Sequence, residues 1–160
     1  MKKMWMLIGP SGSGKSTIST HLIDVENEEI SYYSFDDLRL KWYNPDNYHE
    51  AWLESTQDNQ FTNKVRKEFD RLLTLEKSII VDNTNLTRKS RKWFIKKAKE
   101  SGYETIGIVF DVPLQTLIDR QYTRSDKCVP SQAVIRQYTD LQYPSLDEFD
   151  CILKSNQINK

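Results

Sequence analysis

The feature that most constrains the fold is a nine-residue segment near the start of the chain. Residues 9–17 read Gly-Pro-Ser-Gly-Ser-Gly-Lys-Ser-Thr and follow a short apolar run at residues 4–8. They fit the pattern Gly-x-x-x-x-Gly-Lys-Ser/Thr, which is informative where a strand precedes it and a helix follows. The glycines allow a tight loop whose backbone N–H groups converge on phosphate oxygens, with the positive end of the helix dipole behind them. The segment therefore predicts a P-loop that binds the phosphates of a nucleoside triphosphate.

Two side chains of this loop have expected roles of their own. Lys15 is expected to reach the β- and γ-phosphates, and the Ser16 hydroxyl to ligate the Mg²⁺ ion that bridges them. ATP is the expected donor nucleotide, and Mg²⁺ the expected cofactor. The predicted nucleotide-binding residues of the loop are Gly9, Ser11, Gly12, Ser13, Gly14, Lys15, Ser16 and Thr17.

Short, nearly unbroken apolar runs indicate the rest of the sheet. The runs at residues 4–8, 79–81 and 106–110 are typical of strands buried on both faces of a parallel sheet. Residues 31–34 and 149–153 are expected to add two further strands. Because amphipathic helical segments alternate with these runs, we predict an α/β fold with a central parallel sheet flanked by helices on both faces.

Apolar side chains recur at helical spacing in three segments, and we expect all three stripes to pack in the core. They are Phe61, Val65, Phe69, Leu72 and Leu73; then Leu114, Leu117 and Ile118; then Val134, Ile135, Tyr138 and Leu141. Residues 41–60 have weak periodicity. They are expected to form either short helices or a loop over the site.

Length and charge limit the remaining possibilities. A chain of 160 residues fits one compact domain, residues 1–160. Lysine plus arginine and aspartate plus glutamate both total 23, so the whole chain has no field that attracts a polyanion, and local clusters must hold any anion. Cys128 and Cys151 lack Cys-x-x-Cys spacing and are expected to be reduced. No run reaches the length of a signal sequence or a membrane span, so we expect a soluble, cytoplasmic protein.

The residues after the apolar run at 79–81 favour transfer to an acceptor over hydrolysis. Asp82 lies at a strand's carboxyl end, where α/β sheets present ligand groups. Asn83 follows it, where motor NTPases commonly place a water-activating glutamate, and the base-recognition and sensor patterns of guanine-specific switches do not occur. Asp82 is expected either to orient Mg²⁺ through water or to shape the acceptor pocket. The alternative is an ordinary turn aspartate.

A candidate general base lies just past the expected second strand, in Ser-Phe-Asp-Asp-Leu-Arg at residues 34–39. Asp36 and Arg39 are three apart and share a face if a helix begins there. The carboxylate is expected to accept the acceptor's hydroxyl proton, while the guanidinium orients the acceptor or holds a substrate anion. The alternative is a capping aspartate in an ordinary surface ion pair, and Asp37 competes with Asp36 for the role.

Two arginines are candidates for a lid over the donor. Arg120 and Arg124 are four apart on the helix expected around residues 114–124, on a face turned away from its apolar stripe. An arginine beside the γ-oxygens can raise the rate of phosphoryl transfer roughly 10³–10⁵-fold. We therefore predict a P-loop kinase fold with an arginine-bearing helical lid; solvated arginines are the alternative.

Four motifs together resemble those of a known group. They are the P-loop, the segment at residues 34–39, Val-Asp-Asn-Thr-Asn-Leu at 81–86, and Phe-Asp-Val-Pro at 110–113 with its following Arg-x-x-x-Arg. In order and spacing they resemble the 5′-hydroxyl polynucleotide kinases, that is, the kinase domains of bacteriophage polynucleotide kinase and of bacterial RNA end-repair enzymes. The resemblance covers nearly the whole chain.

The resemblance implies roles that agree with those argued above. It implies that Asp36 is the general base, that Arg39 engages the acceptor's phosphate near the 5′ end, and that Arg120 and Arg124 form a lid over the donor. The implied activity is ATP-dependent phosphorylation of 5′-OH ends of DNA or RNA in end repair, with separate phosphatase and ligase proteins as partners. The predicted catalytic residues are Asp36, Lys15 and Arg124, and the predicted acceptor-binding residues are Asp36, Arg39 and Asp82.

Some alternatives stay open at this point. Asn83 separates Asp82 from the Thr-Asn pair, unlike the phage enzyme's pattern, so the resemblance does not choose among the roles given above for Asp82. A small-molecule kinase acting on a sugar, nucleoside or other alcohol would share the fold, and in a nucleotide-gated binding module Asp36 would be only a cap. The basic segment at residues 88–99 would suit a phosphate backbone, but it is also the pattern of a solvated helix face. Self-association is left open.

Overall fold

The computed structural model describes residues 1–26, 28–124 and 128–158, and its centre is a five-stranded sheet. The strands are β1 (Lys3–Ile8), β2 (Ile30–Tyr33), β3 (Ser78–Asp82), β4 (Glu104–Val109) and β5 (Cys151–Lys154). They lie in the order β2-β3-β1-β4-β5, and every neighbouring pair is parallel. The predicted parallel α/β sheet is confirmed.

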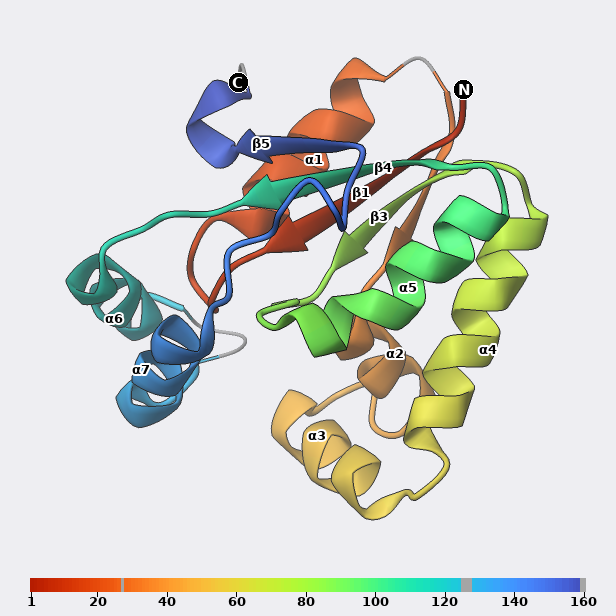
Figure 1. Ribbon diagram of the computed structural model, residues 1–160. Coiled ribbons are helices and arrows are strands. Elements are labelled where there is room, and N and C mark those ends of the chain that lie inside the picture. The colour runs from red at the N-terminus through yellow and green to blue at the C-terminus, as the bar shows by residue number, and fades with distance from the viewer. Residues whose placement is uncertain (27, 125–127, 159–160) are drawn as a thin grey trace.

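Seven α-helices and one 3₁₀ turn complete the described chain (Figure 1). They are α1 (Lys15–Val25), α2 (Phe35–Trp42), α3 (Tyr48–Gln57), α4 (Phe61–Thr74), α5 (Arg88–Glu100), α6 (Leu114–Tyr122), α7 (Ser131–Asp140) and η1 (Ser155–Gln157). The stretch at residues 41–60 thus contains a helix, α3, rather than an unstructured loop. None of the helices within the described ranges is long and apolar enough to cross a membrane.

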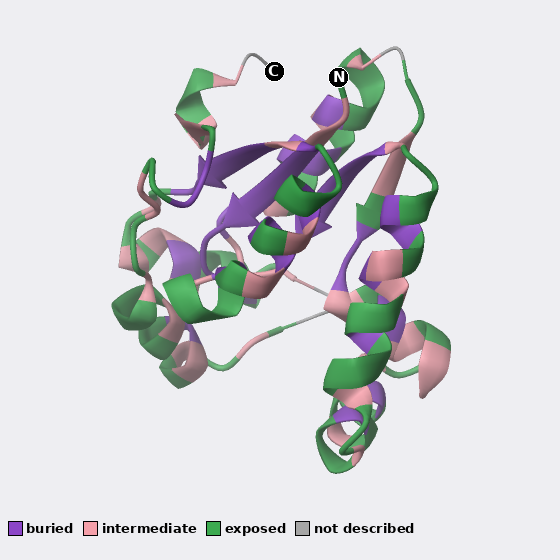
Figure 2. Ribbon diagram, turned by 45° about the vertical axis from the view of Figure 1, so that its right-hand side comes forward, coloured by how far each residue is buried: buried purple, intermediate pink, exposed green. Residues whose placement is uncertain are grey.

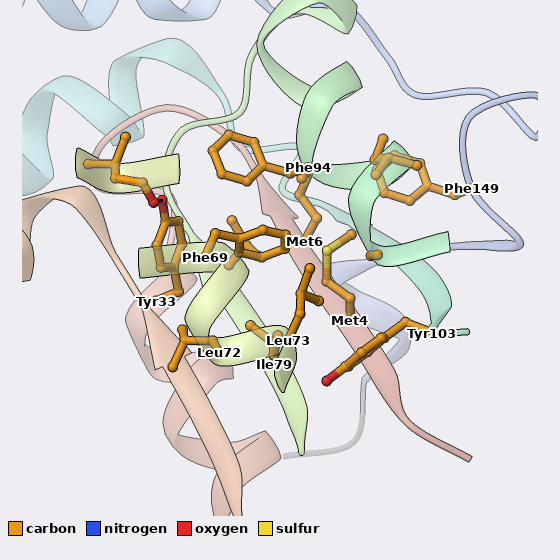
Figure 3. Close-up of a cluster of buried hydrophobic side chains, with 14 of the residues drawn as sticks. Met4, Met6, Tyr33, Phe69, Leu72, Leu73, Ile79, Phe94, Tyr103 and Phe149 are labelled. Atoms are coloured by element: carbon orange, nitrogen blue, oxygen red, sulfur yellow. Dashed lines mark hydrogen bonds between the residues drawn. The ribbon is translucent and has the colours of Figure 1, made fainter. Parts of the chain in front are cut away.

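The sheet has a hydrophobic core on each face because side chains of a strand alternate. On one face, Met4, Met6 and Ile8 of β1 pack with residues of α2, α4 and α5 (Figure 3). On the other face, Trp5 and Leu7 pack with residues of α1. Helices therefore cover both faces of the sheet. The three central strands, β3, β1 and β4, are almost completely buried, whereas the edge strands β2 and β5 are only partly buried (Figure 2).

The expected stripe on α4 is confirmed, with Val65, Phe69, Leu72 and Leu73 buried and Phe61 packed against the same core. The expectation for the last stripe is wrong, because Ile135 and Tyr138 of α7 are each 42% exposed and only Val134 is fully buried. Helices α6 and α7 lie beside each other beyond the carboxyl ends of β1 and β4 (Figure 1). Among the described residues of α7, only Val134 is buried.

Candidate active site

The P-loop connects β1 to α1 at the carboxyl edge of the sheet. Neighbours of β1 are β3 on one side and β4 on the other, so the loop emerges at a topological switch point, where α/β sheets bind ligands. The backbone is left-handed at Gly12 (φ 85°) and at Gly14 (φ 98°), the residue that precedes α1. Since L-residues rarely adopt this conformation, both positions favour glycine.

A cavity of about 570 Å³ opens above this loop. Most of the residues predicted for the site line it, from separate parts of the chain. They are residues 11–17 of the P-loop, Asp36, Asp82, Arg120 and Arg124. Gly9 and Arg39 do not line the cavity. Arg39 instead forms an ion pair with a residue that does, because its Nη1 lies 3.1 Å from Asp36 Oδ1.

The Lys15 side chain folds back over the loop that carries it. Its ammonium group donates hydrogen bonds to the carbonyl oxygens of Gly9 (2.9 Å) and Pro10 (2.8 Å). The positive charge is therefore held at the base of the cavity, at the N-terminal end of α1. Phosphate oxygens are attracted to such a position by both the ammonium group and the helix dipole.

Asp82, at the end of β3, is surrounded by hydroxyl groups. Its Oδ2 accepts a hydrogen bond from the Tyr32 hydroxyl and lies 3.5 Å from both Ser16 Oγ and Ser19 Oγ. Burial, and then the Asp82 charge, raise the pKa of Tyr32 well above its usual value, so this hydroxyl remains a donor. Oxygen ligands of this kind suit Mg²⁺, and Ser16 with Asp82 is the pair that would hold it.

No group of three or more His, Cys, Asp or Glu side chains is placed to hold a metal within the ranges that the structure describes. Ser16 and Asp82 each supply one oxygen at the cavity, which would fit an ion that takes its other ligands from nucleotide phosphates and water, the usual way that Mg²⁺ is bound.

The candidate base lies in the first turn of α2. The Ser34 hydroxyl caps this helix by accepting a hydrogen bond from Asp37 N–H, so the alternative that Asp36 is the capping residue is wrong. Asp36 lines the cavity, whereas Asp37 is not among its lining residues. The ion pair between Asp36 and Arg39 has the predicted spacing of three residues.

Helix α3 supports this pair with residues that the sequence analysis did not identify. The Tyr48 hydroxyl donates to Asp36 Oδ1 (2.6 Å), and Arg39 Nε donates to Ser55 Oγ (3.0 Å). The Arg39 guanidinium also lies over the Phe61 ring, 4.9 Å from its centroid. The Arg39 side chain is only 17% exposed, so this arginine is held in one place rather than free to move in solvent.

The two lid arginines lie at the cavity, but not on one helix as expected. Helix α6 ends at Tyr122, because Thr123 uses both its N–H and its hydroxyl to bind the Arg120 carbonyl. Arg124 then follows the helix, and its N–H donates to the Gln121 carbonyl. Arg120 Nη1 donates to the Gly12 carbonyl (2.9 Å), which brings α6 against the P-loop.

Two glutamines, also missed by the sequence analysis, hold the peptide groups at Ser11. Gln137 of α7 accepts a hydrogen bond from Ser11 N–H (2.8 Å), and Gln121 of α6 donates to the Ser11 carbonyl (3.0 Å). Gln121 is 3% exposed, and its Oε1 accepts from Val129 N–H. Helices α6 and α7, which we call the lid helices, are thus both attached to the P-loop.

The residue that departs from the phage pattern connects two parts of the site. Asn83 Oδ1 accepts a hydrogen bond from Phe35 N–H (2.8 Å), which ties the end of β3 to the start of α2. Its Nδ2 atom is buried and has no hydrogen-bond partner in the described part of the chain. Asn83 therefore positions the strand end that carries Asp82 relative to the helix that carries Asp36.

The chain is similar to known proteins in its sequence and in its fold. The family model described as AAA domain matches residues 4–143. A putative bifunctional polynucleotide kinase/RNA ligase of Autographa californica nuclear polyhedrosis virus is 29% identical over 134 residues, which cover 79% of this chain and 19% of the viral protein. The chain thus spans about a fifth of that relative's length.

Two solved structures have similar folds. The structure of a Pnkp1/Rnl/Hen1 complex matches with 26% identity and a TM-score of 0.59, over 79% of this chain and 43% of the other. A gluconokinase from Sinorhizobium meliloti 1021 matches with 17% identity and a TM-score of 0.64, over 95% and 81%; at this identity the likeness concerns the fold alone. The resemblance to polynucleotide kinases is confirmed, and so is the P-loop kinase fold.

Proposed function

Since the chain belongs to the AAA domain family and has a P-loop kinase fold, we propose that it transfers the γ-phosphoryl group of ATP to the 5′-hydroxyl end of DNA or RNA. The observation that carries the proposal is the Asp36–Arg39 ion pair, 3.1 Å long, at the cavity that the P-loop also lines. A carboxylate beside a fixed guanidinium suits an acceptor that has both a hydroxyl and a phosphate, and a polynucleotide 5′ end has both.

The proposed reaction is an in-line displacement at the γ-phosphorus. The acceptor oxygen forms a bond to phosphorus while the bond between phosphorus and the β–γ bridging oxygen breaks, and ADP leaves. Asp36 takes the proton of the acceptor hydroxyl. Arg39 holds the phosphate next to the acceptor's 5′ end, so most of the rate enhancement comes from positioning.

The residues around the donor stabilise the negative charge on the transferred group. Lys15 lies at the base of the cavity, and Arg120 and Arg124 line it from the lid. Preorganised cations are effective because they need little rearrangement during the reaction. When bound through Ser16 and near Asp82, Mg²⁺ would add further charge neutralisation at the phosphates.

The basic face of α5 is not needed for this proposal. Arg91 is fully buried in an ion pair with Glu148 (3.0 Å), Lys97 lies 3.3 Å from Asp70, and Lys96 lies 4.0 Å from Glu100. Much of the positive charge on this helix is thus compensated within the protein. The arrangement favours a structural or solvated role for α5 over a track for a phosphate backbone.

The proposal includes a biological setting. The viral relative is described as a kinase joined to an RNA ligase, and the solved complex contains Pnkp1 with Rnl and Hen1. These descriptions support the proposal that this kinase acts in nucleic-acid end repair in the cytoplasm, together with a phosphatase and a ligase that process and seal the ends that it phosphorylates.

The test is transfer of label from γ-labelled ATP with Mg²⁺ to single-stranded DNA and RNA oligonucleotides. Matched oligonucleotides that already carry a 5′-phosphate control for labelling elsewhere, and Asp36→Ala controls for contaminating kinases. Label at free 5′ ends only, lost in the variant, is the expected result. If the protein binds ATP but labels neither oligonucleotide, the proposal is wrong, and a small-molecule alcohol becomes the substrate to seek.

A further inference from the structure

Helix α3 contacts both members of the candidate acceptor pair. We propose that Tyr48 and Ser55 are positioning residues that hold Asp36 and Arg39 in the geometry needed for phosphoryl transfer, so that α3 sets the geometry of the acceptor pair. This inference rests on the proposed function and deepens it, because it assigns a catalytic positioning role to α3, which lies outside the P-loop and the lid.

Tyr48 fixes the orientation of the candidate base. Its hydroxyl donates to Asp36 Oδ1 at 2.6 Å, and the same oxygen accepts from Arg39 Nη1 at 3.1 Å. Burial, and then the hydrogen bond to Asp36, raise the pKa of Tyr48 well above its usual value, so the hydroxyl stays a donor at physiological pH. Two donors on one oxygen restrict rotation of the carboxylate, and a base works only within a narrow range of orientations.

Ser55 fixes the guanidinium in a comparable way. The serine is 2% exposed, and its hydroxyl donates to the Trp52 carbonyl at 2.7 Å while it accepts from Arg39 Nε at 3.0 Å. Because the hydroxyl hydrogen is already used, the oxygen is oriented to accept. With Phe61 against the guanidinium face, Arg39 is held by contacts from α3 and α4.

One helix supplies both supports. Tyr48 and Ser55 are seven residues apart, which is nearly two turns and places them on the same side of α3. Ala51, between them on that side, is fully buried. The Asn47 side chain caps the helix by accepting a hydrogen bond from Glu50 N–H at 3.0 Å, which fixes its start next to Tyr48. A shift of α3 would therefore move the base and the arginine supports together.

The experiment compares two variants with two matched controls on the same oligonucleotides. Tyr48→Phe and Ser55→Ala each remove one hydroxyl that contacts the pair. Tyr43→Phe removes a hydroxyl that binds Asp58, and Thr56→Ala removes one that binds a carbonyl of α3 itself. We expect Tyr48→Phe to lower kcat about tenfold and Ser55→Ala to raise KM for the oligonucleotide about fivefold, with KM for ATP unchanged in both. The controls should retain wild-type values.

A double-mutant cycle separates positioning from a general structural effect. If Tyr48 acts through Asp36, Tyr48→Phe adds no further loss to the residual activity of Asp36→Asn. Equal losses in both backgrounds, or a Tyr48→Phe variant as active as Tyr43→Phe, would overturn the inference while the proposed function stands. If the wild type labels no oligonucleotide, the proposed function fails and the inference fails with it.

Discussion

The side-chain amide of Gln137 accepts a 2.8 Å hydrogen bond from the Ser11 backbone N–H, across 126 positions of sequence. Gln121 binds the carbonyl of the same residue. The P-loop conformation is therefore supported by both lid helices as well as by its own glycines. Two amide side chains hold two successive peptide groups in place without adding charge beside the phosphates. The positive charge of the cavity is thus left to Lys15 and the lid arginines.

This relationship predicts that Gln137→Leu weakens ATP binding. The Ser11 N–H loses its partner, and a typical intramolecular hydrogen bond contributes about 0.5–1.5 kcal/mol, so we expect the Kd for ATP to rise about threefold to tenfold. Isothermal titration calorimetry measures the change. Gln115→Leu is the control, because Gln115 is exposed on α6 and binds only Asp119 of its own helix among the contacts described. Equal affinities for the two variants would contradict the prediction.

Because Gly12 lies close to α6, we expect a methyl group at this position to lower both stability and ATP affinity. Gly12 has φ 85°, and a Cβ there would lie 2.6 Å from Gln121 Nε2. Gly102 has a similar φ of 81°, but a Cβ there meets nothing within 4 Å. Both alanine variants carry the backbone strain, about 1–3 kcal/mol. Only Gly12→Ala also displaces Gln121, so its melting temperature and ATP affinity should fall further than those of Gly102→Ala.

The sequence alone predicted those parts of the site in which neighbouring residues act together. The P-loop is contiguous, and Asp36 with Arg39 share a helical turn, so spacing alone places their side chains. Tyr48, Ser55, Gln121 and Gln137 act on residues 12 to 126 positions away. Hydroxyl and amide side chains are common on helix surfaces, and nothing in their own sequence context distinguishes these four.

Periodicity was also insufficient to predict burial. The stripes on α4 and α7 both have helical spacing, yet the α4 stripe is buried and Ile135 and Tyr138 are each 42% exposed. Spacing shows that apolar residues share a face, but the tertiary fold decides what covers that face. The end of α6 was missed for a related reason, since the Thr123 hydroxyl competes with the next helical hydrogen bond.

Stability at low pH should depend on Asp58, which joins the end of α3 to Lys64 and Tyr43. Hydrogen bonds from Lys64 and then Tyr43 lower the pKa of Asp58 from 3.8 to about 2. A carboxylate with a lowered folded-state pKa stabilises the fold above pH 3.8, and this contribution is lost as the pH falls from 3.8 through about 2. In that window the melting temperature of Asp58→Asn should fall less steeply than that of wild type. Added salt should reduce the difference because the group is partly exposed. Asp46→Asn, an exposed position in the preceding connection between α2 and α3, should behave as wild type.

Substitutions of the two lid arginines should differ in how they affect the chemical step and ATP binding. Both line the cavity, but Arg120 also donates to the Gly12 carbonyl, so it supports the P-loop as well as the donor. We expect Arg124→Ala to lower kcat roughly 10³-fold, the lower end of the effect of an arginine at a transferring phosphoryl group, with the Kd for ATP raised less than threefold. Arg120→Ala should both lower kcat and weaken ATP binding. Arg136→Ala, which removes an exposed arginine of α7, should change neither.

Rapid-quench measurements of a single turnover, with ATP affinities from titration, give the two quantities separately. If Arg124→Ala instead loses ATP affinity and keeps its single-turnover rate, Arg124 binds the donor rather than the transition state.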